Sequence, residues 1–333
     1  MVNPVLVETV RGNVVDTRHR GAVAVCDADG AVIWSAGDIE APVFPRSAAK
    51  LFQAVPLVEC GAADSYGLTD EELALACSSH SAEDGHVAAT QSVLDKIGLS
   101  ESDLECGSHW PLHNHRQLVE FIRRGSSPSQ LHNNCSGKHA GFLCACCHQG
   151  IATGGYIETG HALQRQIKAV LEDLTGEQMG EDRCAVDGCS IPSYAVSLHA
   201  LAQGFAKAAT GAGLGPSRAA AVRRLMDACI ANPWFTAGTG RFCVELMRAG
   251  QGAIYAKTGA DGAYVAALPQ AGLGIAVKCI DGATRPAEIM MASVLMRLFA
   301  DDAEMRARLE PLSRRKLKNW NGIVVGEMRP AER

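Results

Sequence analysis

Two polar residues three positions apart, Ser47 and Lys50, form the pattern in this sequence that best suits covalent chemistry. A helix that begins at Ser47 would place Lys50 one turn later on the same face. A serine hydroxyl is a weak nucleophile until a base removes its proton, and the neutral amine of a lysine can be that base. An ordinary helix N-cap followed by a solvated lysine gives the same spacing. The pair is therefore compatible with an acyl-transfer enzyme and with a simple helix start.

A second lysine motif, Ala256-Lys257-Thr258-Gly259, ends a predicted strand near the other end of the chain. An S-x-x-K helix, a K-T-G strand and a helical region between them occur together in serine β-lactamases and penicillin-binding proteins. This combination favours catalysis over coincidence. Backbone amides of Ser47 and of Thr258 or Gly259 are then candidates to bind a developing oxyanion.

The segment Cys77-Ser78-Ser79-His80-Ser81 is the candidate for the third polar element of such a site. The Ser79 hydroxyl could pass a proton to the leaving group. Alternatively, Ser81 simply starts a helix over residues 82–97, because acidic residues follow it.

A possible metal site combines Cys135 and His139 with Cys189, about fifty residues further along the chain. If a helix begins near Cys135, the i and i+4 spacing brings both side chains to one face, and Asp187 could add a fourth ligand for zinc. The alternative interpretation is a pair of buried thiols beside a helix cap.

The composition limits the classes of partner. The 333 residues include 31 Lys and Arg against 36 Asp and Glu, a net charge of −5, so we expect no binding to nucleic acid or anionic lipid. The first residues lack a signal-peptide pattern, and no stretch approaches the roughly 18 apolar residues of a membrane span, so we expect a cytoplasmic protein. Its 13 cysteines are scattered, which favours reduced thiols over a disulfide framework.

Strand patterns gather at the two ends of the chain and helical patterns in the middle. Residues 21–26 and 31–35 predict a hairpin, residues 253–257, 263–268 and 274–279 predict a three-stranded meander, and residues 286–300 predict a covering helix. The sequence therefore predicts an α+β fold with an antiparallel sheet from both chain ends. Residues 1–45 and 247–333 form the predicted sheet domain, residues 46–246 a mainly helical domain, and the active-site cleft is expected between them.

Taken together, the motifs resemble those of the L-asparaginases of the rhizobial type over nearly the whole chain. The matching segments are residues 46–50, 77–80, 134–139, 187–189, 237–241 and 256–259. The resemblance implies a serine β-lactamase/glutaminase-like fold, a homodimer, and hydrolysis of L-asparagine to L-aspartate and ammonia. It also implies two Ser-Lys pairs, Ser47 with Lys50 and Ser79 with Lys257.

The resemblance further implies a zinc ion bound by Cys135, Lys138 and Cys189. The spacing alone favours His139 as the third ligand, because lysine binds a metal only as the neutral amine. With Lys138 as the ligand, His139 and Asp187 become residues that orient the ligands. The expected substrate-binding residues are Arg46, His80, Asn134, Gly238, Thr239, Thr258 and Gly259.

The mechanism expected from these residues starts with Ser47, activated by Lys50, attacking the amide carbon. Ser79 and Lys257 then supply protons to the departing ammonia, and water releases aspartate. The reverse assignment, with Ser79 as the nucleophile, stays open. Two other functions also stay open: hydrolysis of glutamine or a β-lactam on the same fold, and a non-catalytic metal-binding protein.

Overall fold

The computed structural model describes residues 2–111 and 115–331, and the chain forms two compact units. The sheet unit comprises Met1–Ala48, Ala195–Thr210 and Glu245–Arg333. The helical unit comprises Ala49–Tyr194 and Gly211–Val244. The chain thus crosses from the first unit to the second between Ser47 and Lys50.

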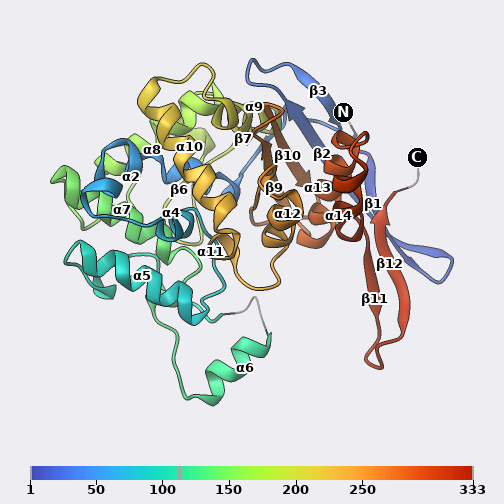
Figure 1. The fold of residues 1–333 in the computed structure, drawn as a ribbon, viewed down its shortest axis with the longest axis horizontal. Helices are drawn as coiled ribbons and strands as arrows, with labels where there is room; N and C mark the ends of the chain where they lie inside the picture. The colour runs from blue at the N-terminus through green and yellow to red at the C-terminus, as the bar shows by residue number, and fades with distance from the viewer. Residues whose placement is uncertain (1, 112–114, 332–333) are drawn as a thin grey trace. The chain divides into compact units, whose positions relative to one another are not determined.

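The sheet unit contains an eight-stranded antiparallel sheet in the order β11-β12-β1-β2-β10-β9-β8, with β3 also paired to β2 (Figure 1). The strands are β1 Val5–Arg11, β2 Val14–Cys26, β3 Val32–Ala36, β8 Tyr255–Thr258, β9 Ala263–Leu268, β10 Leu273–Cys279, β11 Arg315–Lys318 and β12 Val324–Pro330. The predicted hairpin and meander are confirmed as β2-β3 and β8-β9-β10. The α+β prediction, with one antiparallel sheet from both chain ends, is likewise confirmed. The sequence analysis did not identify β1, β11 and β12.

Two helices of this unit, α9 Leu198–Thr210 and α13 Thr284–Leu298, cover opposite faces of the sheet. A Cβ at Gly274 of β10 would lie 1.9 Å from the Ala202 carbonyl of α9, so only glycine permits this approach. A Cβ at Gly21 would lie 2.7 Å from Met290 Sδ of α13. Gly274 pairs with Cys26 and Gly21 with Cys279, and alternation along the strands puts these two pairs on opposite faces.

The division into units differs from the predicted domains at residues 195–210, which the sequence analysis placed in the helical segment. These residues contain α9 and the short strand β7 Val196–Ser197, which pairs with β4 Pro42–Val43. Because α9 packs on β10 and β2, this helical pattern belongs with the sheet. Periodicity predicts a helix and cannot show which surface buries its apolar face.

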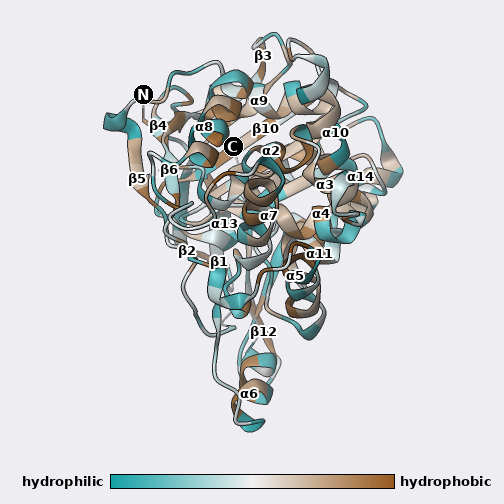
Figure 2. Ribbon diagram, turned by 90° about the vertical axis from the view of Figure 1, so that its left-hand side faces the viewer, coloured by the Kyte–Doolittle hydropathy of each residue, from teal (hydrophilic) through white to brown (hydrophobic). Residues whose placement is uncertain are grey.

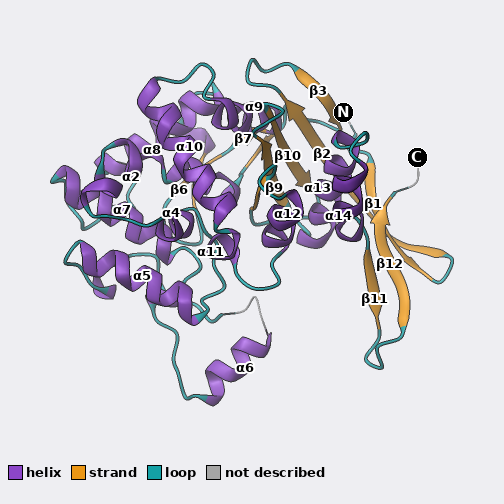
Figure 3. Cartoon of the chain, viewed as in Figure 1, coloured by secondary structure: helices purple, strands orange, loops and turns teal. Residues whose placement is uncertain are grey.

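The helical unit is built around α7, whose residues Ser136–Cys146 are buried. Its helices are α1 Lys50–Gln53, α2 Val55–Glu59, α3 Ala62–Ser65, α4 Asp70–Ala76, α5 Asp84–Lys96, α6 His115–Arg123, α7 Ser136–Gln149, α8 Ala162–Thr175, α10 Pro216–Ala231 and α11 Pro233–Ala237 (Figure 3). A Cβ at Gly137 would lie 2.5 Å from Leu75 Cγ, so this glycine lets α4 approach the start of α7. Figure 2 shows hydrophobic and hydrophilic stretches alternating along these helices, as expected when each buries one face.

Three further short elements complete the fold. They are the hairpin β5 Cys184–Val186 and β6 Pro192–Tyr194, the helix α12 Phe242–Gly250, which crosses from one unit to the other, and α14 Ala303–Leu309 of the sheet unit. Among the described residues, no helix is long and apolar enough to cross a bilayer.

The helix expected to begin at Ser47 is instead three short pieces. Residues Arg46–Ala49 form a 3-10 turn, α1 follows directly, and α2 begins after Ala54 with Pro56 in its first turn. Proline lacks the amide proton that a continuous helix needs at this position, so the chain restarts there.

Candidate active site

In the sheet unit, the turn that carries Ser47 packs against the end of the strand that carries Lys257. A Cβ at Gly259 would lie 2.4 Å from the Pro45 carbonyl and 3.3 Å from Ala48 Cβ, so glycine is required for this contact. Ser47 itself is half-buried. The structure therefore brings the S-x-x-K turn and the K-T-G strand together, as their motifs predict.

The Lys257 side chain is buried, with 1% of its surface exposed, and its Nζ donates to the Thr258 carbonyl at 2.8 Å. The Thr258 hydroxyl donates to the Gly259 carbonyl at 3.1 Å. The Gly259 amide donates to the Ala263 carbonyl at 2.8 Å across the β8-β9 turn. The Gly259 proton is therefore already used within the turn, and the suggestion that an amide of Thr258 or Gly259 binds an oxyanion stays a prediction.

Arg46 lies beside these residues in a strained backbone conformation, with φ of 53°. Its Nη1 pairs with Asp261 Oδ2 at 2.5 Å, and Asp261 has φ of 52°. Left-handed backbone at a residue other than glycine is sparsely populated and concentrates at functional sites. The ion pair holds the guanidinium at the turn, where its predicted role in substrate binding stays a prediction.

In the helical unit, the Lys50 side chain joins two segments that are far apart in sequence, Ser78-Ser79 and Cys135. Lys50 is 1% exposed, and its Nζ donates to Ser79 Oγ at 3.0 Å. It also donates to the Ser78 carbonyl and hydrogen-bonds the Cys135 sulfur. Spacing along the chain suggested Ser47 as the partner of Lys50, and the resemblance implied Lys257 as the partner of Ser79. The hydrogen bond in the structure instead joins Lys50 to Ser79.

The Ser79-His80 backbone is fixed between two other segments of the helical unit. The Ser79 amide donates to the Thr236 carbonyl at 3.0 Å, and the His80 amide donates to the Asn134 carbonyl at 3.2 Å. The His80 ring accepts from the Ala82 amide at Nδ1, at 3.1 Å, and meets Ser136 Oγ at Nε2, at 2.9 Å. Both ring nitrogens are thus used within the protein. These bonds suit a residue that positions Ser79, and direct substrate binding by His80 stays a prediction.

The proposed zinc ligands Cys135, Lys138 and Cys189 lie together in the helical unit. Cys135 caps the N-terminus of α7, and Cys189 lies in the turn between β5 and β6. Lys138 is 1% exposed and donates to Cys189 Sγ at 3.1 Å. Its Nζ also lies 5.4 Å from the Phe142 ring centroid. Spacing along the chain cannot predict this grouping, because Cys189 approaches from a separate hairpin.

The charges in this cluster favour a thiolate at Cys135. A hydrogen bond from Cys189 holds the pKa of Cys135 well below its usual value, and the charges of Lys50 and Lys138 act in the same direction. The same hydrogen bond, together with burial, raises the pKa of Cys189. Burial lowers the pKa of Lys138, but the two neighbouring sulfurs outweigh burial and raise it. One thiolate and one thiol thus share a buried cationic environment.

These donors fit a zinc ion. Sulfur and nitrogen are its usual ligands, and a metal that binds here has to displace the protons of Cys189 and Lys138. His139 Nδ1 is 2.8 Å from the Tyr156 hydroxyl, and its buried Nε2 has no hydrogen-bond partner among the described residues. Within the described residues, neither His139 nor Asp187 joins both cysteines in a group whose donor atoms all lie within 4.8 Å of one another. The geometry therefore favours Lys138 over His139 as the third ligand.

The loop with Gly238 and Thr239 is anchored by Glu83, which the sequence analysis treated only as part of a helix start. The Glu83 carboxylate accepts from the Thr239 amide and from its hydroxyl, each at 2.7 Å. Gly238 has φ of 112°, and a Cβ there would lie 2.6 Å from Glu83 Oε1 and from Ser81 Oγ. Ser81 Oγ in turn donates to the Ala237 carbonyl at 2.8 Å. An acidic residue two positions after the C-S-S-H-S segment was the available signal.

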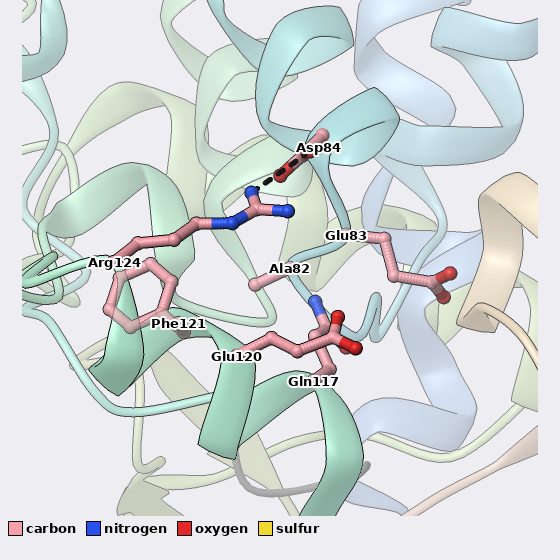
Figure 4. Close-up of a pocket in the computed structure, with 7 residues that line it drawn as sticks. All are labelled: Ala82, Glu83, Asp84, Gln117, Glu120, Phe121 and Arg124. Atoms are coloured by element: carbon pink, nitrogen blue, oxygen red, sulfur yellow. Dashed lines mark ion pairs between the residues drawn. The ribbon is translucent and has the colours of Figure 1, made fainter.

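A pocket of about 220 Å³ lies beside this anchor, between the start of α5 and helix α6 (Figure 4). It is lined by Ala82, Glu83, Asp84, Gln117, Glu120, Phe121 and Arg124. Arg124 pairs with Asp84 at 3.5 Å, and Figure 4 shows this pair on the side away from the Glu83 carboxylate. Three carboxylates against one guanidinium make the pocket acidic. The sequence patterns did not indicate it, because its walls come from segments more than thirty residues apart.

Comparison with known proteins gives a family match over nearly the whole length. A model of the family described as L-asparaginase II matches residues 7–330. No curated protein matches the sequence. Among solved structures, Mglu in its native form is 15% identical with a TM-score of 0.45, over 85% of this chain and 64% of that chain. A beta-lactamase from Mycobacterium bovis is 14% identical with a TM-score of 0.41, over 84% of this chain and 94% of that chain. The chain thus spans 64% of the length of Mglu.

Proposed function

From the premise that this chain belongs to the L-asparaginase II family, we propose that it is an amidohydrolase that converts L-asparagine and water to L-aspartate and ammonia. The hydrogen bond between Lys50 Nζ and Ser79 Oγ carries the proposal. A buried amine and hydroxyl at 3.0 Å are within the range needed for proton transfer during catalysis. Structural lysines usually extend to solvent, whereas this one is enclosed.

Ser47 is the proposed nucleophile, and Lys50 the base. The Ser47 oxygen attacks the side-chain amide carbon while its proton moves to Lys50, which must first be in its neutral form. The contact with Ser79 gives this proton an onward route, through the Ser79 hydroxyl to the amide nitrogen. The carbon–nitrogen bond then breaks, and ammonia leaves. Water hydrolyses the aspartyl ester on Ser47 and restores the free serine.

Lys257 is the second proposed proton carrier. Its buried ammonium lies at the end of β8, against the turn that carries Ser47. A positive charge there favours the negative charge that develops on the carbonyl oxygen of the substrate. Arg46 is proposed to bind the substrate carboxylate, since a guanidinium can donate two parallel hydrogen bonds to it.

Zinc is proposed as a cofactor held by Cys135, Lys138 and Cys189. Bound there, it would act as a Lewis acid that polarises or orients an oxygen of the substrate. Cys135 also hydrogen-bonds Lys50, so the ligand cluster and the catalytic lysine share a contact. Metal removal is therefore expected to alter the position of Lys50 and to weaken catalysis.

The experiment that tests the nucleophile compares Ser47→Ala with Ser79→Ala. Ammonia release from L-asparagine is measured for each, and acyl-enzyme is trapped by rapid acid quench and mass spectrometry. We expect no acyl-enzyme from Ser47→Ala, and slow formation of acyl-enzyme from Ser79→Ala. Wild-type turnover by Ser47→Ala would refute this assignment, and trapping on Ser47 alone would exclude the reverse one.

Substrate choice is tested in the same assay with L-glutamine and a chromogenic cephalosporin. We expect the highest kcat/KM with L-asparagine. Higher kcat/KM with L-glutamine would assign the protein as a glutaminase, and hydrolysis of the cephalosporin alone would assign it as a β-lactamase. No hydrolysis of any substrate by the zinc-loaded protein would contradict the proposed function.

A further inference from the structure

A second cluster of metal-binding side chains lies in the sheet unit and shares no residue with the site described above. His19 Nδ1 meets Asp281 Oδ2 at 2.5 Å, and Cys279 Sγ donates to Asp281 Oδ1 at 3.0 Å. The donor atoms of all three residues lie within 4.8 Å of one another. Among the described residues, this is the one group of at least three His, Cys, Asp and Glu side chains with such spacing.

The backbone around this cluster is fixed on both sides. His19 lies on β2, and Cys279 ends β10, which pairs with β2 through Cys279 and Gly21. The Cys279 amide donates to the Gly262 carbonyl at 2.9 Å, and the Ile280 amide donates to the Arg20 carbonyl at 2.9 Å. Two strands and a turn therefore hold the three side chains together. Ligands on rigid elements keep their geometry better than ligands on loops.

The burial of the three residues suits a metal site that is open on one side. Cys279 is fully buried, the His19 side chain is 15% exposed, and the Asp281 side chain is 45% exposed. A buried thiol next to a carboxylate contributes little as a packing residue. A thiolate at the same position is useful as a ligand for a cation. The exposed side leaves room for one water molecule as a fourth ligand, which completes a tetrahedron.

We propose that His19, Cys279 and Asp281 bind a zinc ion at the surface of the sheet unit. The ligands are His19 Nδ1, Cys279 Sγ and Asp281 Oδ2, a nitrogen, sulfur and oxygen set that suits zinc better than calcium or magnesium. Asp281 Oδ1 also accepts from the Ala283 amide at 2.9 Å, and this bond orients the carboxylate. Binding replaces the thiol proton of Cys279 and any proton on His19 Nδ1, and both pass to solvent.

The site is tested by counting zinc ions per chain. The full-length protein is stripped with a chelator, loaded with zinc and desalted, and bound zinc is measured by mass spectrometry of the element. We expect His19→Ala and Cys279→Ala each to bind one zinc ion fewer than the wild type. Cys26→Ala is the matched control, because Cys26 is a buried cysteine of β2 outside the cluster, and it should bind as much zinc as the wild type.

The count also separates this site from the proposed catalytic one. Cys189→Ser should lose the ion of the helical unit and keep the ion of the sheet unit. If the catalytic cluster binds no zinc, the wild type should still bind one ion, and His19→Ala none. Equal zinc in the wild type, His19→Ala and Cys279→Ala would overturn the proposal whatever the state of the other cluster.

A spectroscopic measurement distinguishes loss of the metal site from a variant that fails to fold. Cobalt(II) bound to a thiolate gives a charge-transfer absorption band. In the Cys189→Ser protein, this band should form on addition of cobalt(II), and the further change Cys279→Ala should remove it. Zinc should raise Tm in the wild type by more than in His19→Ala, since a ligand that binds only the folded state stabilises it. Absence of the band from a folded Cys189→Ser protein would contradict the site.

Discussion

The two cysteine-containing clusters of this protein show how neighbouring charge decides the state of the same side chain. In the helical unit, Cys135 is next to Lys50, Lys138 and a second thiol, and its pKa is held well below the usual value. In the sheet unit, burial and the adjacent Asp281 carboxylate raise the pKa of Cys279 to about 12. Both thiols are buried, so desolvation alone does not explain the difference.

The comparison shows a cysteine that is already negatively charged in the helical unit, Cys135, and a neutral thiol in the sheet unit, Cys279. The neutral thiol becomes a ligand only when the proposed metal ion binds. Cys135 already carries the negative charge that a metal ligand needs, because its pKa is held low. A thiol bonded to a carboxylate releases its proton only when a metal competes for the sulfur. Substitutions in the two clusters should therefore have different consequences for activity.

The largest expected effect comes from Lys50→Met, which keeps the length of the side chain and removes the amine. We expect kcat for ammonia release to fall about 10²- to 10⁴-fold, the usual contribution of a general base. Lys168→Met on the surface of α8 is the matched control, since it breaks only an exposed pair with Glu172. A Lys50→Met protein with near wild-type kcat would end the assignment of the helical cluster as the catalytic one.

A smaller effect is expected from Cys189→Ser, which leaves Lys138 and Cys135 without the second sulfur. We expect kcat/KM to fall about tenfold or more, because even residues that only orient metal ligands contribute this much. Cys279→Ser should leave kcat/KM unchanged, as its cluster takes no part in the proposed reaction. Equal losses in the two variants would remove the functional distinction between the clusters.

The rigidity of the loop that carries Gly238 and Thr239 can be tested at Gly238. In Gly238→Ala the new Cβ meets Glu83 and Ser81 at 2.6 Å and the backbone keeps φ of 112°, so we expect a loss of about 1–3 kcal/mol in the free energy of unfolding, with a higher KM. Gly240→Ala is the control, because its φ is 70° and nothing lies within 4 Å of the new Cβ. Chemical denaturation and steady-state kinetics measure both. Similar KM values in the two variants would count against Gly238 and Thr239 as a substrate-binding loop.

The smallest effect concerns His86, whose ring stacks on Trp234 with centroids 3.9 Å apart. Burial lowers the pKa of His86, so below about pH 6.5 the unfolded chain takes up a proton that the folded chain resists. The free energy of unfolding should therefore decrease as the pH falls below about 6.5, by at most about 1.4 kcal/mol per pH unit from this group.

His86→Gln should flatten this dependence, measured by denaturation at pH 7.5 and 5.5. His148→Gln, an exposed residue of α7, controls for the loss of an imidazole. An unchanged slope in His86→Gln would show that other groups dominate the acid response of the helical unit.

Much of the fold could be predicted from local patterns. The apolar runs at residues 21–26, 253–257, 263–268 and 274–279 gave the central strands, because strands covered on both faces are apolar throughout and end at turn-forming residues. Strands β1, β11 and β12 carry weaker patterns, as β11 is mostly exposed and β1 is buried only over its second half. The position of α9 on the sheet was also not predicted, because a helical pattern does not show which surface the helix packs against.

For the candidate site, too, local patterns predicted some features and missed others. Ser47, Lys50, Ser79 and Lys257 were proposed from their types, their spacing and the resemblance, and the turn of Ser47 does pack against the K-T-G strand. Glu83 was missed as the anchor of Thr239, because the two residues are 156 positions apart. The cluster of His19, Cys279 and Asp281 gave no sequence signal either, since β2 and β10 become neighbours only in the folded sheet.

The sequence by itself determined which chemistry is available, because residue type and local spacing fix a serine and a lysine one turn apart, and place a cysteine at the start of a helix. Only the tertiary structure decided the partners. It placed Ser79 within 3.0 Å of Lys50 and chose Lys138 over His139 as the neighbour of Cys189. The physical reason is that long side chains reach groups on other elements, and the distances between elements depend on packing across the whole unit.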